Sequence, residues 1–114
     1  MISPRGEDLL IYGFGSYFNG RADFQDIDLL IVHESTDQKS CSLAIKCKEL
    51  LMTQISNAHI SILSKNEAKQ LSFIEKSKAV IIGTVSSNTM HAGAKSIKET
   101  TTAQHPQRTI NYEK

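Results

Sequence analysis

Two aspartates and a glycine-serine pair near the start of the chain could together bind a metal ion. Asp26 and Asp28 open one apolar run, and Gly15-Ser16 ends an earlier one. Side chains two apart on a strand point to the same face, so the two carboxylates would stand side by side. Hard cations such as Mg²⁺ take oxygen ligands, commonly one or two carboxylates together with the phosphates of a substrate. The pattern therefore predicts a site for a divalent cation and a phosphorylated ligand.

Further features from Gly15 to Arg21 bear on this site. Gly15 would let the backbone approach a phosphate closely, and Ser16 would offer it a hydroxyl and an N–H. Arg21 could reach a polyphosphate as a bidentate donor. Asn19-Gly20 is a strong turn signal, however, and it favours Arg21 as an ordinary surface-loop residue. The ordinary alternatives for the other features are a solvated strand end and a simple turn.

These residues, taken together, resemble the motif of the nucleotidyltransferase superfamily typified by DNA polymerase beta, particularly its small bacterial "minimal" members. That motif is an apolar residue, Gly-Ser, about ten residues, then Asp-apolar-Asp-apolar. Here it reads Phe14-Gly15-Ser16, nine intervening residues, and Asp26-Ile27-Asp28-Leu29. The resemblance covers about residues 9 to 80 and is specific only over 13 to 32. It implies a nucleoside triphosphate as ligand, Mg²⁺ held by Asp26 and Asp28, and a phosphate cradle at Gly15 and Ser16.

The chain departs from the family at the third metal-binding carboxylate, which the resemblance places on a later strand. The segment 58–62 reads Ala-His-Ile-Ser-Ile, so His59 is the first candidate for that position and Ser61 the second. Neutral imidazole is a poor ligand for Mg²⁺, but it could bind Mn²⁺ or Zn²⁺, or act as a base toward a hydroxyl. His59 could equally be a hydrogen-bonded strand histidine without a catalytic role.

Two functions from different classes therefore remain. One is an enzyme that transfers a nucleoside monophosphate from a triphosphate to a hydroxyl acceptor, with Asp26, Asp28 and His59 as its catalytic residues. The other is a catalytically weak or inactive module on the same fold, which would bind a nucleotide or a partner protein, as an antitoxin-like subunit does. The missing third carboxylate favours the module, whereas the joint presence of Gly15, Ser16, Asp26 and Asp28 favours the enzyme.

The elements that must position these residues follow from apolar patterning. Continuous or alternating apolar runs predict strands at 9–13, 26–32, 58–63 and 79–85, the last at or near an edge of the sheet. Apolar residues that recur at intervals of three and four predict a helix over 38–56. A second helix, over 65–77, would begin with a capping box at Ser64 and Glu67. This order predicts an α/β or α+β fold with a small mixed sheet and helices packed on it.

Residues 86–114 differ in composition from the rest of the chain. They contain few apolar side chains and much Ser, Thr, Lys and Gln, with no sustained period. Such a segment buries too little apolar surface to offset its loss of chain entropy. We therefore expect a nucleotidyltransferase-like domain over 1–85 and a disordered or extended C-terminal tail over 86–114, which could dock on a protein partner.

Charge and cysteine usage limit the classes of partner. Thirteen basic and twelve acidic residues nearly cancel, so net charge gives no indication of a nucleic-acid partner. The longest apolar run is far shorter than a membrane span requires. Cys41 and Cys47 have neither metal-ligand spacing nor a shared helix face suited to a disulfide, so reduced thiols are expected. Without a recognisable leader at the start, the expected location is the cytoplasm.

Overall fold

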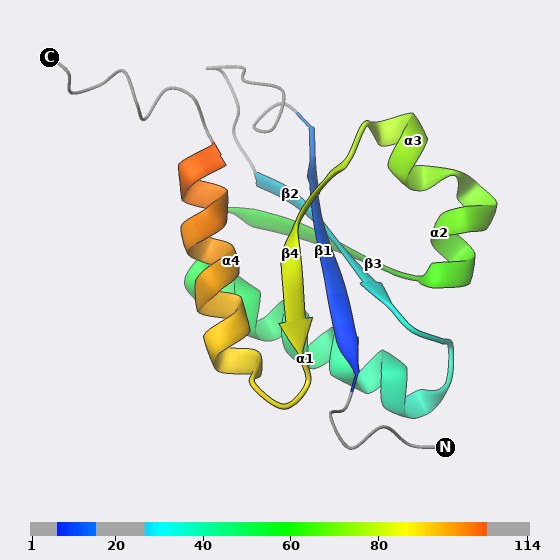
Figure 1. Cartoon of the computed structure of the whole chain (residues 1–114), viewed down its shortest axis with the longest axis horizontal. Coiled ribbons are helices and arrows are strands. Elements are labelled where there is room, and N and C mark those ends of the chain that lie inside the picture. Colours follow the sequence, from blue (N-terminus) through cyan, green and yellow to red (C-terminus); the bar gives the residue numbers. More distant parts are fainter. Residues whose placement is uncertain (1–6, 16–26, 105–114) are drawn as a thin grey trace, which may run out of the picture.

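Four strands and four helices make up most of the described part of the chain in the computed structural model (Figure 1). The structure describes residues 7–15 and 27–104. The strands are β1 (Asp8–Phe14), β2 (Ile27–His33), β3 (Ala58–Ser64) and β4 (Val80–Ser86). The helices are α1 (Gln38–Gln54), α2 (Lys65–Leu71), α3 (Phe73–Ser77) and α4 (Met90–Gln104).

The strands form one mixed sheet in the order β3-β2-β1-β4. β1 pairs antiparallel with both β2 and β4, whereas β2 and β3 are parallel. Parallel neighbours need a crossover connection, and α1 provides it. The predicted small mixed sheet with packed helices is confirmed, each predicted strand overlaps an observed one, and β4 lies at an edge as expected.

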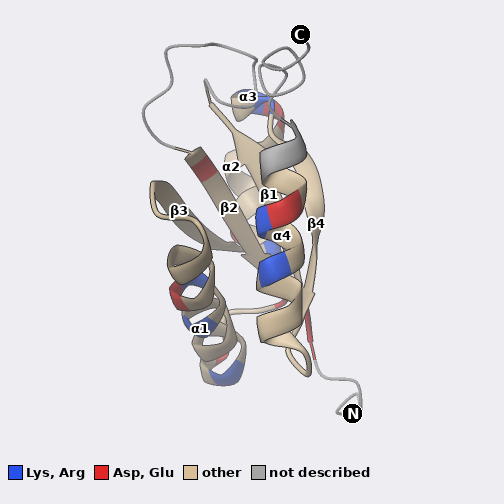
Figure 2. Ribbon diagram, turned by 90° about the vertical axis from the view of Figure 1, so that its left-hand side faces the viewer, with Lys and Arg blue, Asp and Glu red and all other residues tan. Residues whose placement is uncertain are grey.

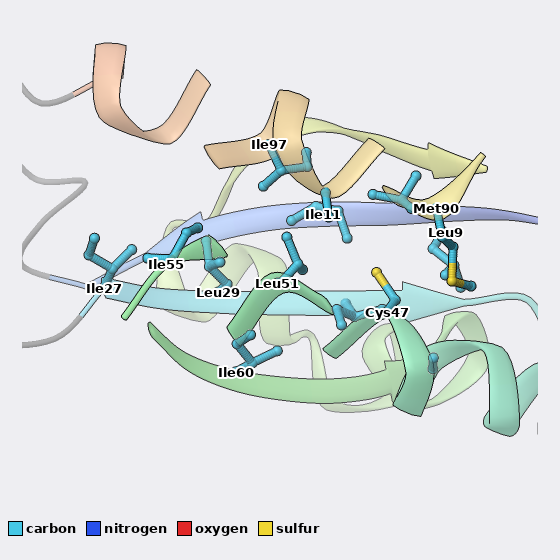
Figure 3. Packing of buried hydrophobic residues seen from close by; sticks show 14 residues of the cluster. Leu9, Ile11, Ile27, Leu29, Cys47, Leu51, Ile55, Ile60, Met90 and Ile97 are labelled. Atoms are coloured by element: carbon cyan, nitrogen blue, oxygen red, sulfur yellow. The ribbon is translucent and has the colours of Figure 1, made fainter. Parts of the chain in front are cut away.

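The main hydrophobic core lies between one face of the sheet and the pair α1 and α4, which pack against each other (Figures 1 and 2). β1 alternates buried with partly exposed positions, so Leu9 and Ile11 point to this face. Leu29 from β2 and Leu51 from α1 meet them there (Figure 3). All four side chains are completely buried, and each such burial stabilises the fold by about 1.5–3 kcal/mol.

The helices α2 and α3 cover part of the opposite face of the sheet. Leu30 and Val32 of β2 point there and pack against Ala68 of α2 and against Phe73 and Ile74 of α3. Alternate residues of a strand share a face. Asp28, two positions before Leu30, therefore lies on this side of the sheet, away from the main core.

The predicted C-terminal tail is wrong over residues 90–104, which form α4. Met90, Ala94, Ile97 and Thr101 are all buried, and their spacing of three and four residues places them on one stripe. The stripe is short of large apolar side chains, which is why the composition indicated disorder. Gly93 offsets this scarcity, because a Cβ built on it would lie 3.0 Å from Cγ1 of Val85, so the helix can approach β4 closely. Residues 105–114 lie outside the described part.

The helix predicted over 65–77 is interrupted. α2 begins as expected: the Ser64 hydroxyl accepts a hydrogen bond from Glu67 N (3.1 Å), and the Glu67 carboxylate accepts one from Ser64 N (2.9 Å). Ser72 then adopts the left-handed conformation, with φ of 51°, and this residue ends α2 and begins α3. Turning the chain at Ser72 brings Phe73 and Ile74 onto the sheet.

The crossover helix α1 agrees with its prediction over most of its length. The carboxylate of Asp37 caps its first turn by accepting from Ser40 N at 2.8 Å. Cys41 and Cys47 are both free thiols. Burial of Cys47 in the main core raises the pKa of its thiol to about 12, so this side chain acts as a small apolar residue.

The exposed surfaces of the helices are mostly polar, with Ile45 and Met52 of α1 and Leu71 of α2 as exposed apolar side chains. Acidic and basic residues are both present on α1 and α4, as Figure 2 shows. None of the described helices combines the length and the apolar character that crossing a bilayer requires.

Candidate functional site

Asp28 lies on β2, the middle one of the three neighbouring strands β3, β2 and β1, at one end of the sheet. It pairs in register with Phe14 of β1 on one side and with His59 of β3 on the other. Its side chain keeps 27% of its surface exposed to solvent. A carboxylate held on a strand yet open to water can ligate a cation without paying the full cost of burying a charge.

Gly15 lies directly against this carboxylate. It follows the last residue of β1 and has a φ of 84°, a conformation that side-chain-bearing residues rarely adopt. A Cβ built on Gly15 would overlap Oδ2 of Asp28. The backbone conformation favours glycine here, and a side chain at this position would also require the Asp28 carboxylate to move.

His59 lies on the other side of Asp28. Its Nδ1 is 3.5 Å from Oδ1 of Asp28, and 80% of its side chain is exposed. The parallel register of β2 and β3 produces this contact, because directly paired residues point to the same face. A contact of this kind with so exposed a side chain contributes little to stability, so the fold gains little from placing an imidazole here.

Two aromatic rings lie on the same face of the sheet beside the acid. Phe14 of β1 and Phe73 of α3 meet edge to face, with ring centroids 5.3 Å apart and an interplanar angle of 88°. Both rings are partly buried and pack against the second core cluster. The contact ties α3 to the strand that leads into Gly15.

The sequence-predicted site residues divide into three groups. Gly15, Asp28 and His59 come together at one corner of the sheet. Ser61, the second candidate for the third position, pairs with Leu30 and so lies two residues further along β3 from His59. Ser16, Arg21 and Asp26 lie outside the described residues, so their predicted contribution stays a prediction.

The donor set at this corner consists of one carboxylate and one imidazole. Within residues 7–15 and 27–104, no group of three or more His, Cys, Asp or Glu side chains converges as a metal-binding cluster. Asp28 fits a hard cation such as Mg²⁺, which usually takes one or two carboxylates and completes its shell with phosphates and water. His59 does not fit that ion, since Mg²⁺ disfavours nitrogen ligands.

A second polar cluster, which sequence reasoning missed, lies around the buried Ser40 at the start of α1. The Ser40 hydroxyl donates to Oε2 of Glu7 (2.9 Å) and accepts from Ser35 N (3.1 Å). His33 Nδ1 lies 3.0 Å from the same oxygen. Since the hydroxyl proton is directed to Glu7, the imidazole must carry a hydrogen on Nδ1 and donate it to Ser40.

This cluster is a structural clasp and does not have the arrangement of a nucleophilic triad. A catalytic histidine stands between the serine and the acid, whereas here Ser40 stands between His33 and Glu7. Ser40 and His33 are only 2% and 3% exposed, which leaves no approach for a substrate. No local motif identifies the cluster, because Glu7 and Ser40 are 33 residues apart.

Comparison with known proteins identifies no family for this chain. No protein-family model, no curated protein and no solved structure matches it. What the corner formed by Gly15, Asp28 and His59 could bind must therefore be argued from the chemistry of its residues.

Proposed function

We propose that this protein binds a nucleoside triphosphate together with a divalent cation at the corner formed by Gly15, Asp28 and His59. Asp28 ligates the cation, and the backbone at Gly15-Ser16 receives the phosphates that the cation accompanies. Asp26, Ser16 and Arg21 complete the site in this proposal, as the sequence motif predicts.

The observation that carries this proposal is the apposition of Gly15 and Asp28. A glycine without a Cβ lets backbone N–H groups approach a polyphosphate, and a carboxylate against that glycine reaches a cation bound to the same polyphosphate. The two residues are thirteen positions apart in sequence, yet the Asp28 carboxylate fills the space that a side chain on residue 15 would take. Antiparallel pairing of β1 and β2 accounts for their meeting, and the close fit of the two groups supports a shared ligand.

The resemblance to the minimal nucleotidyltransferases supports the same ligand. That family combines a Gly-Ser turn after one strand with an Asp-x-Asp pair on the next. In this chain, antiparallel pairing of β1 and β2 puts Phe14 opposite Asp28, so the turn and the acid share one end of the sheet. Assignment to the nucleotidyltransferase fold is part of the proposal.

The donor residues at this corner differ from that family's three carboxylates. The difference concerns whether the protein can catalyse nucleotide transfer. His59 lies beside Asp28, and by the family resemblance it takes the place of a third acid that would serve the metal that activates an attacking hydroxyl. Binding of the nucleotide and its cation is accordingly the function we propose. Transfer of the nucleoside monophosphate to a hydroxyl of a protein, an RNA or a small molecule is the further property that distinguishes an enzyme from a regulatory module.

Calorimetric titration of the four nucleoside triphosphates, with and without Mg²⁺, tests the binding step. Wild type is compared with Asp28→Asn, which removes the charge but keeps the size, and with Glu49→Gln, which removes an exposed charge on α1. Metal-dependent binding that is lost only in Asp28→Asn supports the proposal. Equal binding by Asp28→Asn and wild type, or no metal-dependent binding by either, overturns it.

A second step separates enzyme from module. Wild type is incubated with triphosphates labelled at the α-phosphate and with protein, RNA and small-molecule acceptors. Label transfer that disappears in Asp28→Asn identifies a nucleotidyltransferase. Metal-dependent binding without transfer identifies a nucleotide-binding module.

A further inference from the structure

We infer that His59 and Asp28 form a mixed nitrogen and oxygen site that favours Mn²⁺ over Mg²⁺. This inference rests on the proposed function and specifies its cation. It starts from the 3.5 Å between Nδ1 of His59 and Oδ1 of Asp28.

The separation of the two donor atoms suits joint coordination of one ion. Ligands that bind a divalent metal at about 2.1 Å and lie at right angles are roughly 3 Å apart, and wider angles extend this separation. The measured 3.5 Å is within small side-chain adjustments of that range. The strands fix the two Cα positions, because the residues are direct partners in the ladder of β2 and β3.

Exposure leaves the remaining coordination positions free for a ligand. His59 is 80% exposed and Asp28 keeps 27% of its side chain exposed, so both donors can be reached from solvent. An octahedral ion held by these two groups keeps about four positions for phosphate oxygens and water. A closed structural site would surround its metal with protein ligands, which this corner does not do among the described residues.

The donor types determine which ion fits. Mg²⁺ prefers oxygen and loses its water reluctantly, so an imidazole adds little to its affinity. Mn²⁺ accepts carboxylate and phosphate oxygens as readily as Mg²⁺ does, and it also accepts an imidazole nitrogen. Zn²⁺ binds imidazole well but favours tetrahedral sites with few ligands, which suits a polyphosphate less. His59 therefore selects Mn²⁺ among ions that accompany triphosphates.

The competing explanation is a solvent-exposed ion pair without a metal. If that explanation holds, replacing His59 does not change the preference for one metal over the other. Metal selectivity therefore separates the two explanations more cleanly than stability does, since exposed pairs of this kind change stability by at most about 1 kcal/mol.

The main experiment compares Mn²⁺ with Mg²⁺ in binding a non-hydrolysable ATP analogue to the full chain. The quantity measured is the ratio of the affinities in the presence of Mn²⁺ and of Mg²⁺. A ratio is needed because Mn²⁺ often binds more tightly than Mg²⁺ regardless of the site. His59→Ala is compared with wild type and with His91→Ala, which removes an exposed histidine on α4. We expect His59→Ala to lower the Mn²⁺ to Mg²⁺ ratio about tenfold and His91→Ala to leave it unchanged.

Electron spin echo spectroscopy of bound Mn²⁺ supplies a readout that does not depend on activity. Protein labelled with ¹⁵N at histidine should show coupling to a directly coordinated nitrogen, and His59→Ala should lose it. Replacing the imidazole with an oxygen ligand in His59→Asp should raise Mg²⁺ affinity and remove the preference for Mn²⁺.

The outcomes also separate this inference from the proposed function. An unchanged ratio in His59→Ala together with no nitrogen coupling in wild type overturns the inference, while metal-dependent nucleotide binding through Asp28 would still stand. Loss of all metal-dependent binding in wild type overturns both. A ratio that falls equally in His59→Ala and His91→Ala also overturns the inference, because the effect would not belong to this site.

Discussion

The carboxylate of Asp28 occupies the space in which a side chain on Gly15 would have to lie. This contact lies where β1 ends and β2 begins. Phe14 and Asp28 are the last pair of the antiparallel ladder between those strands. Gly15 bends away at a φ of 84° immediately after that pair. The absence of a Cβ thus determines how close the backbone of the turn and the acid can be.

Replacing Gly15 with alanine should destabilise the protein and displace Asp28. A left-handed conformation costs alanine about 1–2 kcal/mol, and relief of the overlap with Oδ2 of Asp28 requires a further shift of the carboxylate. We expect urea unfolding to show a loss of about 2 kcal/mol and calorimetry to show weaker nucleotide binding.

A double-mutant cycle distinguishes the two contributions to this loss. Asp28→Ala removes the carboxylate group that overlaps the new methyl, so Gly15→Ala should cost less in that background. The conformational cost at residue 15 should remain. Strict additivity of the two substitutions would show that the carboxylate and the turn are not in contact.

Removing the Ser40 hydroxyl should loosen the clasp at the start of α1. The substitution Ser40→Ala deprives Glu7, His33 and Ser35 of their shared partner. Leaving buried polar groups unpaired costs about 1–3 kcal/mol, and Ser40 is almost completely buried. Chemical denaturation should show this loss, whereas Ser42→Ala on the exposed side of α1 should leave stability unchanged. Equal stability of the two variants would contradict the clasp.

The parts of the fold that could be predicted from sequence are those encoded by neighbouring residues. Strand positions followed from apolar runs, and the start of α2 followed from the capping box of Ser64 and Glu67. The contact of Gly15 with Asp28 was expected from the sequence motif, and antiparallel pairing of the consecutive strands β1 and β2 brings their ends together. Placing His59 beside Asp28 depended on more than local sequence, because it requires β3 to pair with β2 in parallel and in this register.

Features that depend on long-range packing could not be predicted. The buried stripe of α4 includes Ala94 and Thr101, and its buried character appears only when the sheet and α1 are present. Glu7 meets Ser40 because the sheet positions both β1 and α1. The spacing of apolar residues in the sequence does not predict this contact. Ser72 carries no helix-breaking signal of its own, yet packing of Phe73 on the sheet is associated with a left-handed turn there.

Acid should weaken the protein through the carboxylates that begin two helices. Hydrogen bonds from the Ser64 backbone and then its side chain hold the pKa of Glu67 below its ordinary 4.5. The Ser40 backbone N–H and then the Ser35 hydroxyl hold the pKa of Asp37 below its ordinary 3.8. Because both pKa values are lower in the folded state, the stabilisation is complete above the unfolded values and disappears as pH falls through the folded ones.

The measurement is the free energy of unfolding between about pH 5 and about pH 3. Glu67→Gln keeps an oxygen acceptor but cannot titrate, so its stability should decline less with acid than that of wild type. Asp37→Asn should behave in the same way at the lower end of this range, and Glu49→Gln on the solvent side of α1 serves as control. Parallel pH profiles for all four proteins would exclude the two caps as the acid-sensitive groups.

Enlarging Gly93 should separate α4 from the sheet and show whether that helix belongs to the cooperative core. A Cβ on Gly93 would lie 3.0 Å from Cγ1 and 3.2 Å from Cα of Val85. The backbone of Val85 cannot yield easily, since it pairs with Leu9 in β1.

We therefore expect Gly93→Leu to lose about 1–3 kcal/mol by overpacking, even though leucine is the better helix former. Ala92→Leu adds the same side chain at the adjacent exposed position and should be neutral or slightly stabilising. Denaturant midpoints and hydrogen exchange of α4 amides measure both effects. Equal stability of the two variants, with rapid exchange of the α4 amides in wild type, would show that the helix does not pack on β4. The buried Ile97 and Met90 would then lose their role in the core.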